Sequence, residues 1–379
     1  MINKIINIGS ARACFSEFTG AGGVSEYHVM IRVTDIMATY QQQLDAVLDA
    51  YQHLLTTELK GATAVFKRYF LSDAANQADD VIASDVSDCA KSIIEQAPLD
   101  GTKIALWAYL MAGVSTRQTD SGLYEAAHGS YRHLWNGTAF NLAANSEHQM
   151  RLLFNEYVMQ LAHEECTLAD NCIRTWLFVN DIDLNYGGVV RARNQVFFTQ
   201  GLTPETHFIA STGIGGRQQD PNVLAQMDNY AVKGISREQV HHLYASTHLN
   251  RTSDYGVSFE RGTYVDYGDR RHVFISGTAS INNKGEVMYP KDIVKQTARM
   301  IENVETLLAE AECTLDDACE MIVYLRDMAD YQVVRDVFAQ RFPDKPVVIV
   351  HAPVCRPGWL VEMECTAVKA ISNPNHPQF

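Results

Sequence analysis

Apolar side chains recur at helical spacing in three separate stretches of the chain. Residues three and four apart share one face of a helix, so each stretch predicts a helix with a single buried face. The clearest examples are Leu44, Val47, Leu48, Tyr51, Leu54 and Leu55, and later Met300, Ile301, Val304, Leu307 and Leu308. A short turn and an apolar run of strand length follow each helix, over residues 64–71, 172–179 and 319–325.

A second helix is predicted after each of these strands, over residues 75–95, 187–200 and 329–341. Each leads into another apolar strand, at residues 103–112, 207–214 or 346–353. Strands also precede each first helix, as in "GTYVDYG" and "HVFISGTASIN" before the last one. The unit is therefore roughly β-β-α-β-α-β, which predicts an α+β fold with helices packed on one face of mixed sheets.

The same unit recurs along the chain. Residues 149–180 align without a gap to residues 296–327, and both contain Glu-Cys-Thr-Leu followed by a matching aspartate and cysteine. A fainter copy begins at Gln41. These repeats predict a degenerate first unit (1–115), a second unit (116–216), an irregular polar connector (217–256) and a third unit (257–379), possible parts of one intrachain pseudo-trimer.

Three sequence features could indicate metal or phosphate binding, but each also has a purely structural interpretation. His241, His242 and His248 lack a carboxylate or cysteine at metal-binding spacing, so we expect surface histidines. The "GIGG" at 213–216 lacks the lysine of a phosphate loop and predicts a tight turn. The repeated Cys166, Cys172, Cys313 and Cys319 are expected to pack as small apolar residues rather than to bind metal.

Composition narrows the range of partners. The 379 residues are 46% hydrophobic, and the formal net charge is −14. Nucleic acids and anionic membranes attract basic surfaces, so neither is an expected partner. The N-terminal residues lack the apolar core of a signal peptide, so none is expected, and no run is long enough to predict a membrane span. Eight cysteines without framework spacing are typical of a protein in a reducing cytoplasm, where we expect this one. A small carboxylate-bearing metabolite remains possible where arginines gather locally.

The stretch "HAPVCRPGWLVEMECTAV", residues 351–368, combines a core-like strand with ionisable groups. Strand alternation places Glu362 and Glu364 on one side. Burial would raise the pKa of one carboxyl towards neutrality, as a general acid needs, while the other pairs with a cation. Arg356, in a Pro-Gly turn, could hold a substrate carboxylate in a bidentate manner, or form a surface ion pair.

Further candidate site residues lie beside this stretch and elsewhere in the chain. Arg261 would pair with a second carboxylate, and Cys355 beside Arg356 is either a reactive thiol of lowered pKa or a buried inert one. Ser276 and Gly277 would bring backbone N–H groups close to a ligand, or form a β-bulge. Arg191 and Arg193 diverge on a helix, so at most one faces a given pocket.

The third unit resembles the YjgF/Rid family, also known by an endoribonuclease L-PSP label, through "FISGTASIN", the helix from Gln296, "LRDMADY" and "CR…VEMECTA". Such proteins are usually homotrimers with small-molecule sites between subunits. The whole chain resembles the chorismatases more narrowly, through "RTWLFVNDIDLNYGGVVRARNQVF", "HFIASTGIGG", "VSFERGTYV" and "VCRPGWLVEMEC". The arginine-rich helix departs from that family, because no further arginine follows Arg193.

The chorismatase resemblance implies release of the enolpyruvyl group of chorismate as pyruvate, without metal or cofactor. It implies that Glu362 is the acid, that Cys355 marks the subtype giving 3-hydroxybenzoate rather than a dihydrodiol, and that Arg193 faces the substrate. Two alternatives stay open: a Rid-type imine or enamine deaminase in which Arg356 holds the substrate, and a non-catalytic metabolite-binding protein. The chain is expected to be a monomeric pseudo-trimer or a small homo-oligomer.

Overall fold

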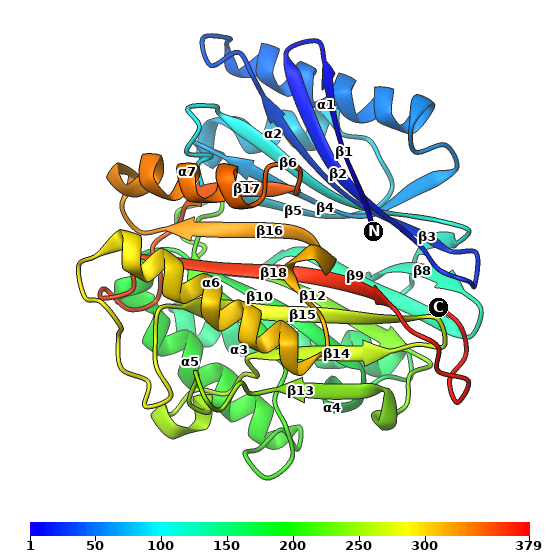
Figure 1. Ribbon diagram of the computed structural model, residues 1–379. Coiled ribbons are helices and arrows are strands. Elements are labelled where there is room, and N and C mark those ends of the chain that lie inside the picture. Colours follow the sequence, from blue (N-terminus) through cyan, green and yellow to red (C-terminus); the bar gives the residue numbers. More distant parts are fainter.

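The structure is a computed structural model that describes residues 1–379 as three units, each built on a six-stranded mixed sheet (Figure 1). The first unit contains β1 (Ile2–Ile8), β2 (Ala11–Thr19), β3 (Ser25–Val33), α1 (Tyr40–Thr57), β4 (Ala62–Leu71), α2 (Ala74–Ser84), β5 (Ala90–Glu95) and β6 (Ile104–Ala112).

The second unit contains β7 (Ser115–Gln118), β8 (Tyr124–His128), β9 (Tyr131–Phe140), α3 (Ser146–His163), α4 (Leu168–Asn171), β10 (Cys172–Val179), α5 (Ile182–Thr199), β11 (Ala210–Gly215) and β12 (Ala225–Lys233). The third contains β13 (Val240–Leu243), β14 (Gly262–Asp266), β15 (Arg270–Ala279), α6 (Ile293–Glu310), β16 (Ala318–Leu325), α7 (Tyr331–Arg341), β17 (Val347–His351) and β18 (Val361–Ala370). Short 3₁₀ turns lie at 237–239, 252–255, 315–317 and 328–330.

All three sheets have the same strand order. In the first it is β1-β2-β3-β6-β4-β5, and the other two repeat it with their own strands. Alternate residues of β6 show how each sheet is covered: Leu106, Ala108 and Leu110 pack with α1 and α2, while Trp107 and Tyr109 face the middle of the molecule. The α+β fold of tandem units, predicted from the sequence, is confirmed.

Two local predictions are wrong. The helix expected over 75–95 ends at Ser84, because the Asp85 carboxylate turns the chain by binding Lys67, Tyr69 and Ser87, and residues 90–95 then form β5. The β-β-α-β-α-β unit is also two strands short of each six-stranded sheet. Each sheet begins with an additional edge strand, and the unit further missed β5 in the first sheet and the central strand β12 in the second.

The prediction of an irregular connector over residues 217–256 is also wrong. Residues 225–233 form β12, which lies between β9 and β10 in the second sheet, and residues 240–243 form the edge strand β13 of the third. The second unit therefore continues past residue 216 to the end of β12. The "GIGG" segment is not a tight turn, because its first three residues complete β11 and pair with β10.

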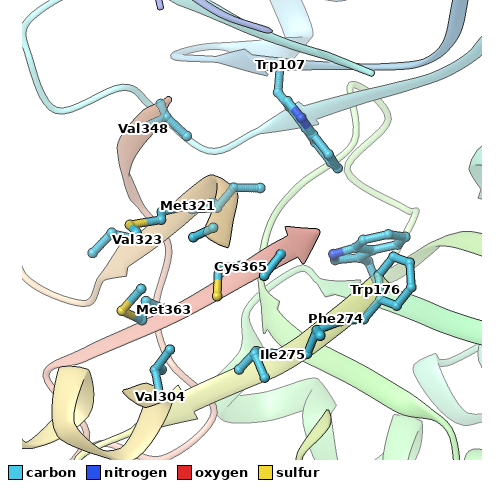
Figure 2. Packing of buried hydrophobic residues seen from close by; sticks show 14 of the residues in the cluster. Trp107, Trp176, Phe274, Ile275, Val304, Met321, Val323, Val348, Met363 and Cys365 are labelled. Atoms are coloured by element: carbon cyan, nitrogen blue, oxygen red, sulfur yellow. The ribbon is translucent and has the colours of Figure 1, made fainter. Parts of the chain in front are cut away.

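Backbone bridges join the three units in a ring. Ile214 of β11 pairs with Val354 of the third unit, Val350 of β17 pairs with Pro98 of the first, and Glu95 of β5 pairs with Arg217 of the second. Inside the ring, one hydrophobic cluster takes residues from all three sheets. Figure 2 shows Trp107 of the first unit and Trp176 of the second in this cluster. Their ring centroids are 6.4 Å apart. No helix is both long and apolar enough to cross a membrane.

Because the three sheets share one strand order, each position in one unit has an equivalent position in each of the other two. Leu71, Val179 and Leu325 end equivalent strands, which each carry one register shift near their start. Opposite them on the central strands lie Ile104, Ala225 and Val361. The next residues, Ala105, Gln226 and Glu362, therefore occupy equivalent positions. This correspondence allows the three inter-unit clefts to be compared residue by residue.

Candidate active site

A pocket lies between the second and third units where β11 and α5 meet β15, β18 and the loop before β14. It is lined by Tyr186, Arg193, Ser211, Gly213, Tyr255, Val257, Phe259, Arg261, Gly277, Ala279, Ile281, Cys355, Arg356, Trp359 and Glu362. Six of the seven predicted site residues line it. The seventh, Ser276, does not: its hydroxyl is fully buried, accepts from the Ser211 N–H at 2.9 Å and donates to the Glu260 carbonyl at 2.6 Å.

Glu362 is the one carboxyl group in this lining. It comes from β18, and only 3% of the residue is exposed. Gly277 provides its space, because a Cβ at that glycine would lie 2.0 Å from Oε1 of Glu362. Burial, reinforced by the negative charge of Glu364, raises the pKa of Glu362 to about 8, while Arg261 and Arg174 oppose the rise. Glu362 is therefore largely protonated at neutral pH.

Glu364, two residues along β18, has a different environment. Its carboxylate accepts from Nη2 of Arg174 at 2.8 Å and from Nε1 of Trp176 at 2.7 Å, and it also accepts from the Thr212 hydroxyl. Nη1 of Arg68, from the first unit, lies 3.9 Å away. The two glutamates thus share a strand face but differ as the sequence suggested: one faces a pocket and is protonated, the other is ion-paired.

Arg193 and Arg191 diverge on α5. Arg193 is 1% exposed, lines the pocket, and its Nε and Nη2 have no hydrogen-bond partner in the protein. Arg191 points outward and binds the Glu147 carboxylate at 2.8 Å. A buried guanidinium with unpaired N–H groups is costly, and a bound anion would satisfy it.

Arg261 and Arg356 complete a group of three guanidinium groups around the pocket. Nη2 of Arg261 donates to the Asn250 side chain at 3.0 Å and to its carbonyl at 3.1 Å. Arg356 lies over the rings of Tyr255 and Trp359, at 4.7 and 5.1 Å from their centroids. Neither arginine forms an ion pair with a protein carboxylate, so both can pair with an anionic ligand.

Cys355 is not the activated thiol that its neighbour suggested. Burial, and then the nearby Glu362, raise the pKa of the Cys355 thiol to about 12, and the opposing effects of Tyr186 and Arg356 are smaller. The residue therefore faces the pocket as a neutral thiol. The reactive-thiolate interpretation is wrong because desolvation outweighs the adjacent positive charge.

The segment around Gly277 forms a β-bulge, as one of the two interpretations allowed. The register of β15 against β18 shifts between Ile275 and Thr278. The N–H of Ser276 binds the Arg261 carbonyl, and the N–H of Gly277 binds the Thr212 hydroxyl at 2.8 Å. These N–H groups are therefore used within the protein, and the contribution of the bulge is the space it leaves for Glu362.

Sequence reasoning missed the aromatic wall of the pocket, formed by Tyr186, Tyr255, Phe259 and Trp359. Tyr186 lies beside Gly213, where a Cβ would approach its ring to 2.9 Å. The indole N–H of Trp359 and the hydroxyl of Tyr255 are buried without a partner. A glycine two residues from a strand end was the one available signal, and it indicates the close approach only once Tyr186 is known to lie opposite.

The other two clefts lack the acid. At the position of Glu362, the first unit has Ala105 and the second has Gln226. Gln226 does not line an open pocket, because β5 packs directly on β9 there: Thr138 Oγ1 accepts from the Ile93 N–H at 2.8 Å and donates to the Lys91 carbonyl at 3.0 Å. Only the cleft between the second and third units combines a buried carboxylic acid with several arginines.

Comparison with known proteins agrees with this architecture. The Endoribonuclease L-PSP family model matches residues 259–369. A RutC family protein from Saccharolobus solfataricus is 33% identical over 96 residues, which are 25% of this chain and 76% of the relative. The chain belongs to the RutC family. The YjgF/Rid superfamily expected from the sequence is thereby confirmed, through the third unit.

Two further similarities bear on this RutC-family chain. A protein named 3-aminoacrylate deaminase RutC, from Acinetobacter baylyi, is 28% identical over 97 residues, 25% of this chain and 77% of the relative. A crystal structure titled chorismatase superposes with a TM-score of 0.63 at 19% identity, covering 80% of this chain and 93% of the other. At that identity the second match establishes a shared fold that extends over more than one unit.

Proposed function

We propose that this chain is a chorismatase-like enzyme that releases the enolpyruvyl group of chorismate as pyruvate. The observation that carries the proposal is the environment of Glu362, a buried carboxylic acid with a pKa of about 8 in a pocket shared with three arginines that lack carboxylate partners. A dicarboxylate substrate matches the charge of that pocket, and an acid-labile enol ether matches its proton donor.

In the proposed reaction, Arg193, Arg261 and Arg356 bind the two carboxylates and hold the enol ether against Glu362. Glu362 donates its proton to the terminal methylene carbon, which becomes a methyl group, and the ether carbon becomes an oxocarbenium ion. Water adds to that carbon, and the resulting hemiketal breaks into pyruvate and the ring alcohol. A proton from the water returns to Glu362, so the acid is regenerated without any redox step.

Two ring products are possible once the oxocarbenium ion has formed. A dihydrodiol retains one water molecule more than 3-hydroxybenzoate, so formation of 3-hydroxybenzoate requires one ring oxygen to leave as water while the ring becomes aromatic. The neutral thiol of Cys355 lines the same pocket as Glu362. Within the proposal, Cys355 directs the reaction towards 3-hydroxybenzoate, and replacing it with alanine should increase the share of dihydrodiol.

The direct test incubates purified protein with chorismate and measures pyruvate against an enzyme-free control. Glu362→Gln should abolish release while preserving the fold, because Gln226 occupies the equivalent buried position in the second unit. Pyruvate release by the variant at the wild-type rate would remove Glu362 from the acid's role. No release by the wild-type protein would reject the reaction itself.

A second candidate is supported by the relative named 3-aminoacrylate deaminase. In that reaction Arg356 would hold the substrate carboxylate while water attacks the iminium carbon, and ammonia would leave. Ammonia release from freshly generated 2-aminoacrylate, together with inertness towards chorismate, would favour this function. A ligand-induced thermal shift without turnover of either compound would indicate a binding protein instead.

A further inference from the structure

A second pocket lies between the third and first units, where α7 and β17 lie against the first sheet (Figure 1). It is the ring counterpart of the Glu362 pocket. The bridge between Val350 and Pro98 repeats the bridge between Ile214 and Val354, and the Leu99 N–H donates to the Ile349 carbonyl at 3.0 Å beside it. α7 and β17 thus take the place here that α5 and β11 take beside Glu362.

The equivalent positions carry different chemistry. The parallel edge strands β11 and β17 end at the equivalent residues Gly215 and His351. Four and two residues before these ends, Val347 and Ile349 of β17 take the places of Ser211 and Gly213 of β11. Asp100 lies two residues after the bridge at Pro98, as Arg356 lies two residues after the bridge at Val354. Since Ala105 stands where Glu362 would be, this cleft has no proton donor at that position.

The cleft has its own cationic groups. Arg32 lies directly opposite Ala105 on β3, and Arg12 lies opposite Arg32 on β2. Both line the pocket, and neither forms an ion pair within the protein, whereas Arg335 on α7 pairs with Asp336 at 2.7 Å. Lys345 is already used, since its ammonium donates to the Asp316 and Ala318 carbonyls. Two guanidinium groups are thus free for a ligand in a protein of net charge −14.

The rest of the lining is apolar. Tyr331, Phe338 and Phe342 come from α7 and the residue after it, and Val347 and Ile349 from β17. Asp100 is the single acid in the lining, and one of its oxygens accepts from Thr102. A cavity that combines apolar side chains with two guanidinium groups outside any ion pair matches a molecule with an apolar body and one carboxylate.

The geometry points to a second, non-catalytic site in this cleft, which binds a small organic carboxylate with an apolar body through Arg12 and Arg32. Where the ligand is an α-amino acid, its ammonium faces Asp100. This inference does not rest on the proposed chorismatase activity, because it concerns a different cleft and different residues.

Titration calorimetry with 3-phenylpropanoate and L-phenylalanine as probes tests the site in the full chain. We expect saturable binding of at least one probe, weakened about tenfold or more by Arg32→Gln, since a hydrogen bond to a charged group is lost. Ala339→Trp, at an exposed position of α7 in the pocket lining, should block binding by filling the cleft. Thermal melting confirms that each variant is folded.

Arg261→Gln is the matched control, because both probes could also enter the Glu362 pocket. Binding that survives Arg261→Gln but is lost in Arg32→Gln and Ala339→Trp supports the second site. Binding that is lost in Arg261→Gln and retained in the other two variants overturns it, as does the absence of binding by either probe in the millimolar range. A preference for L-phenylalanine that disappears in Asp100→Asn would support the role of Asp100, and a preference unchanged by that substitution would overturn it.

Discussion

Replacing Glu362 with glutamine should make the protein more stable at alkaline pH. The folded protein raises the pKa of Glu362 from 4.5 to about 8, chiefly by burial. A group whose pKa is higher in the folded state contributes stability below its unfolded pKa and loses it as pH rises through the folded pKa. The wild-type protein therefore loses stability between about pH 4.5 and 8, because folding keeps protonated a carboxyl that is ionised in the unfolded chain, and glutamine removes this pH dependence.

The magnitude follows from the difference between the two pKa values. At about 1.4 kcal/mol per pH unit, the rise from 4.5 to about 8 corresponds to on the order of 5 kcal/mol of unfolding free energy by pH 9. Denaturant unfolding of both proteins at pH 5, 7 and 9 measures it. The difference between variant and wild type should move in favour of the variant by several kcal/mol as the pH rises.

Glu320 must be separated from this effect, because burial also raises its pKa to about 8. Glu320 remains in both proteins, so its contribution cancels in the difference between them. Glu320→Gln provides a parallel control, and it should stabilise at high pH without removing a group from the pocket. Equal pH dependence of unfolding in the wild type and Glu362→Gln would refute a protonated, buried Glu362.

Three further outcomes follow from the pocket. Gly277→Ala places a Cβ where Oε1 of Glu362 lies, so pyruvate release should fall by roughly 100-fold, whereas Gly187→Ala, whose Cβ meets only the flexible Arg191 side chain, should leave it unchanged. Cys355, with a pKa of about 12, should resist iodoacetamide at pH 8 in the native protein, and rapid labelling detected by mass spectrometry would contradict this. Arg193→Ala should raise the KM for chorismate about tenfold or more, while Arg191→Ala, which removes an exposed ion pair, should not.

The helices and several core strands could be predicted because their apolar periodicity is local. α1, α3 and α6 each have apolar faces of regular spacing, and the matching residues 149–180 and 296–327 identified the repeat. β12 was missed for the opposite reason. Its buried Asp228 and Asn229 look like loop residues, and Asp228 is tolerated only because Arg68 of another unit and the Thr138 N–H bind it.

The candidate site also combines residues that a local sequence pattern could predict with residues that it could not. Glu362, Cys355 and Arg356 were suggested by one short stretch in which ionisable groups interrupt a core strand. Tyr186 and Trp359 gave no such signal, because an aromatic residue packs equally well in a core or in a pocket wall. Their role depends on how α5 of one unit meets β18 of the next, which no local pattern encodes.

The ionic network around Glu364 depends on the three units carrying different residues at this position. At the position of Glu364, the first and second units have Trp107 and Asp228. Arg68 of the first unit forms an ion pair with Asp228 at 2.9 Å, and its guanidinium lies 3.9 Å from Glu364. Arg174 of the second unit forms an ion pair with Glu364 at 2.8 Å. Two guanidinium groups from two units therefore neutralise two carboxylates near the middle of the ring. Three identical units would bring three glutamates and no tryptophan to this place, and like charges in a water-poor interior repel strongly.

The fused chain avoids that repulsion because each unit can carry a different residue. The charge that remains on Glu364 is fixed by its partners, and it contributes to raising the pKa of Glu362 two residues away. The asymmetry at the centre of the ring therefore adds to the effect of burial in keeping the one acid in the pocket protonated. Loss of Arg174 would leave Glu364 with fewer partners, and its effect should reach both the stability of the ring and the pH dependence of any reaction at Glu362.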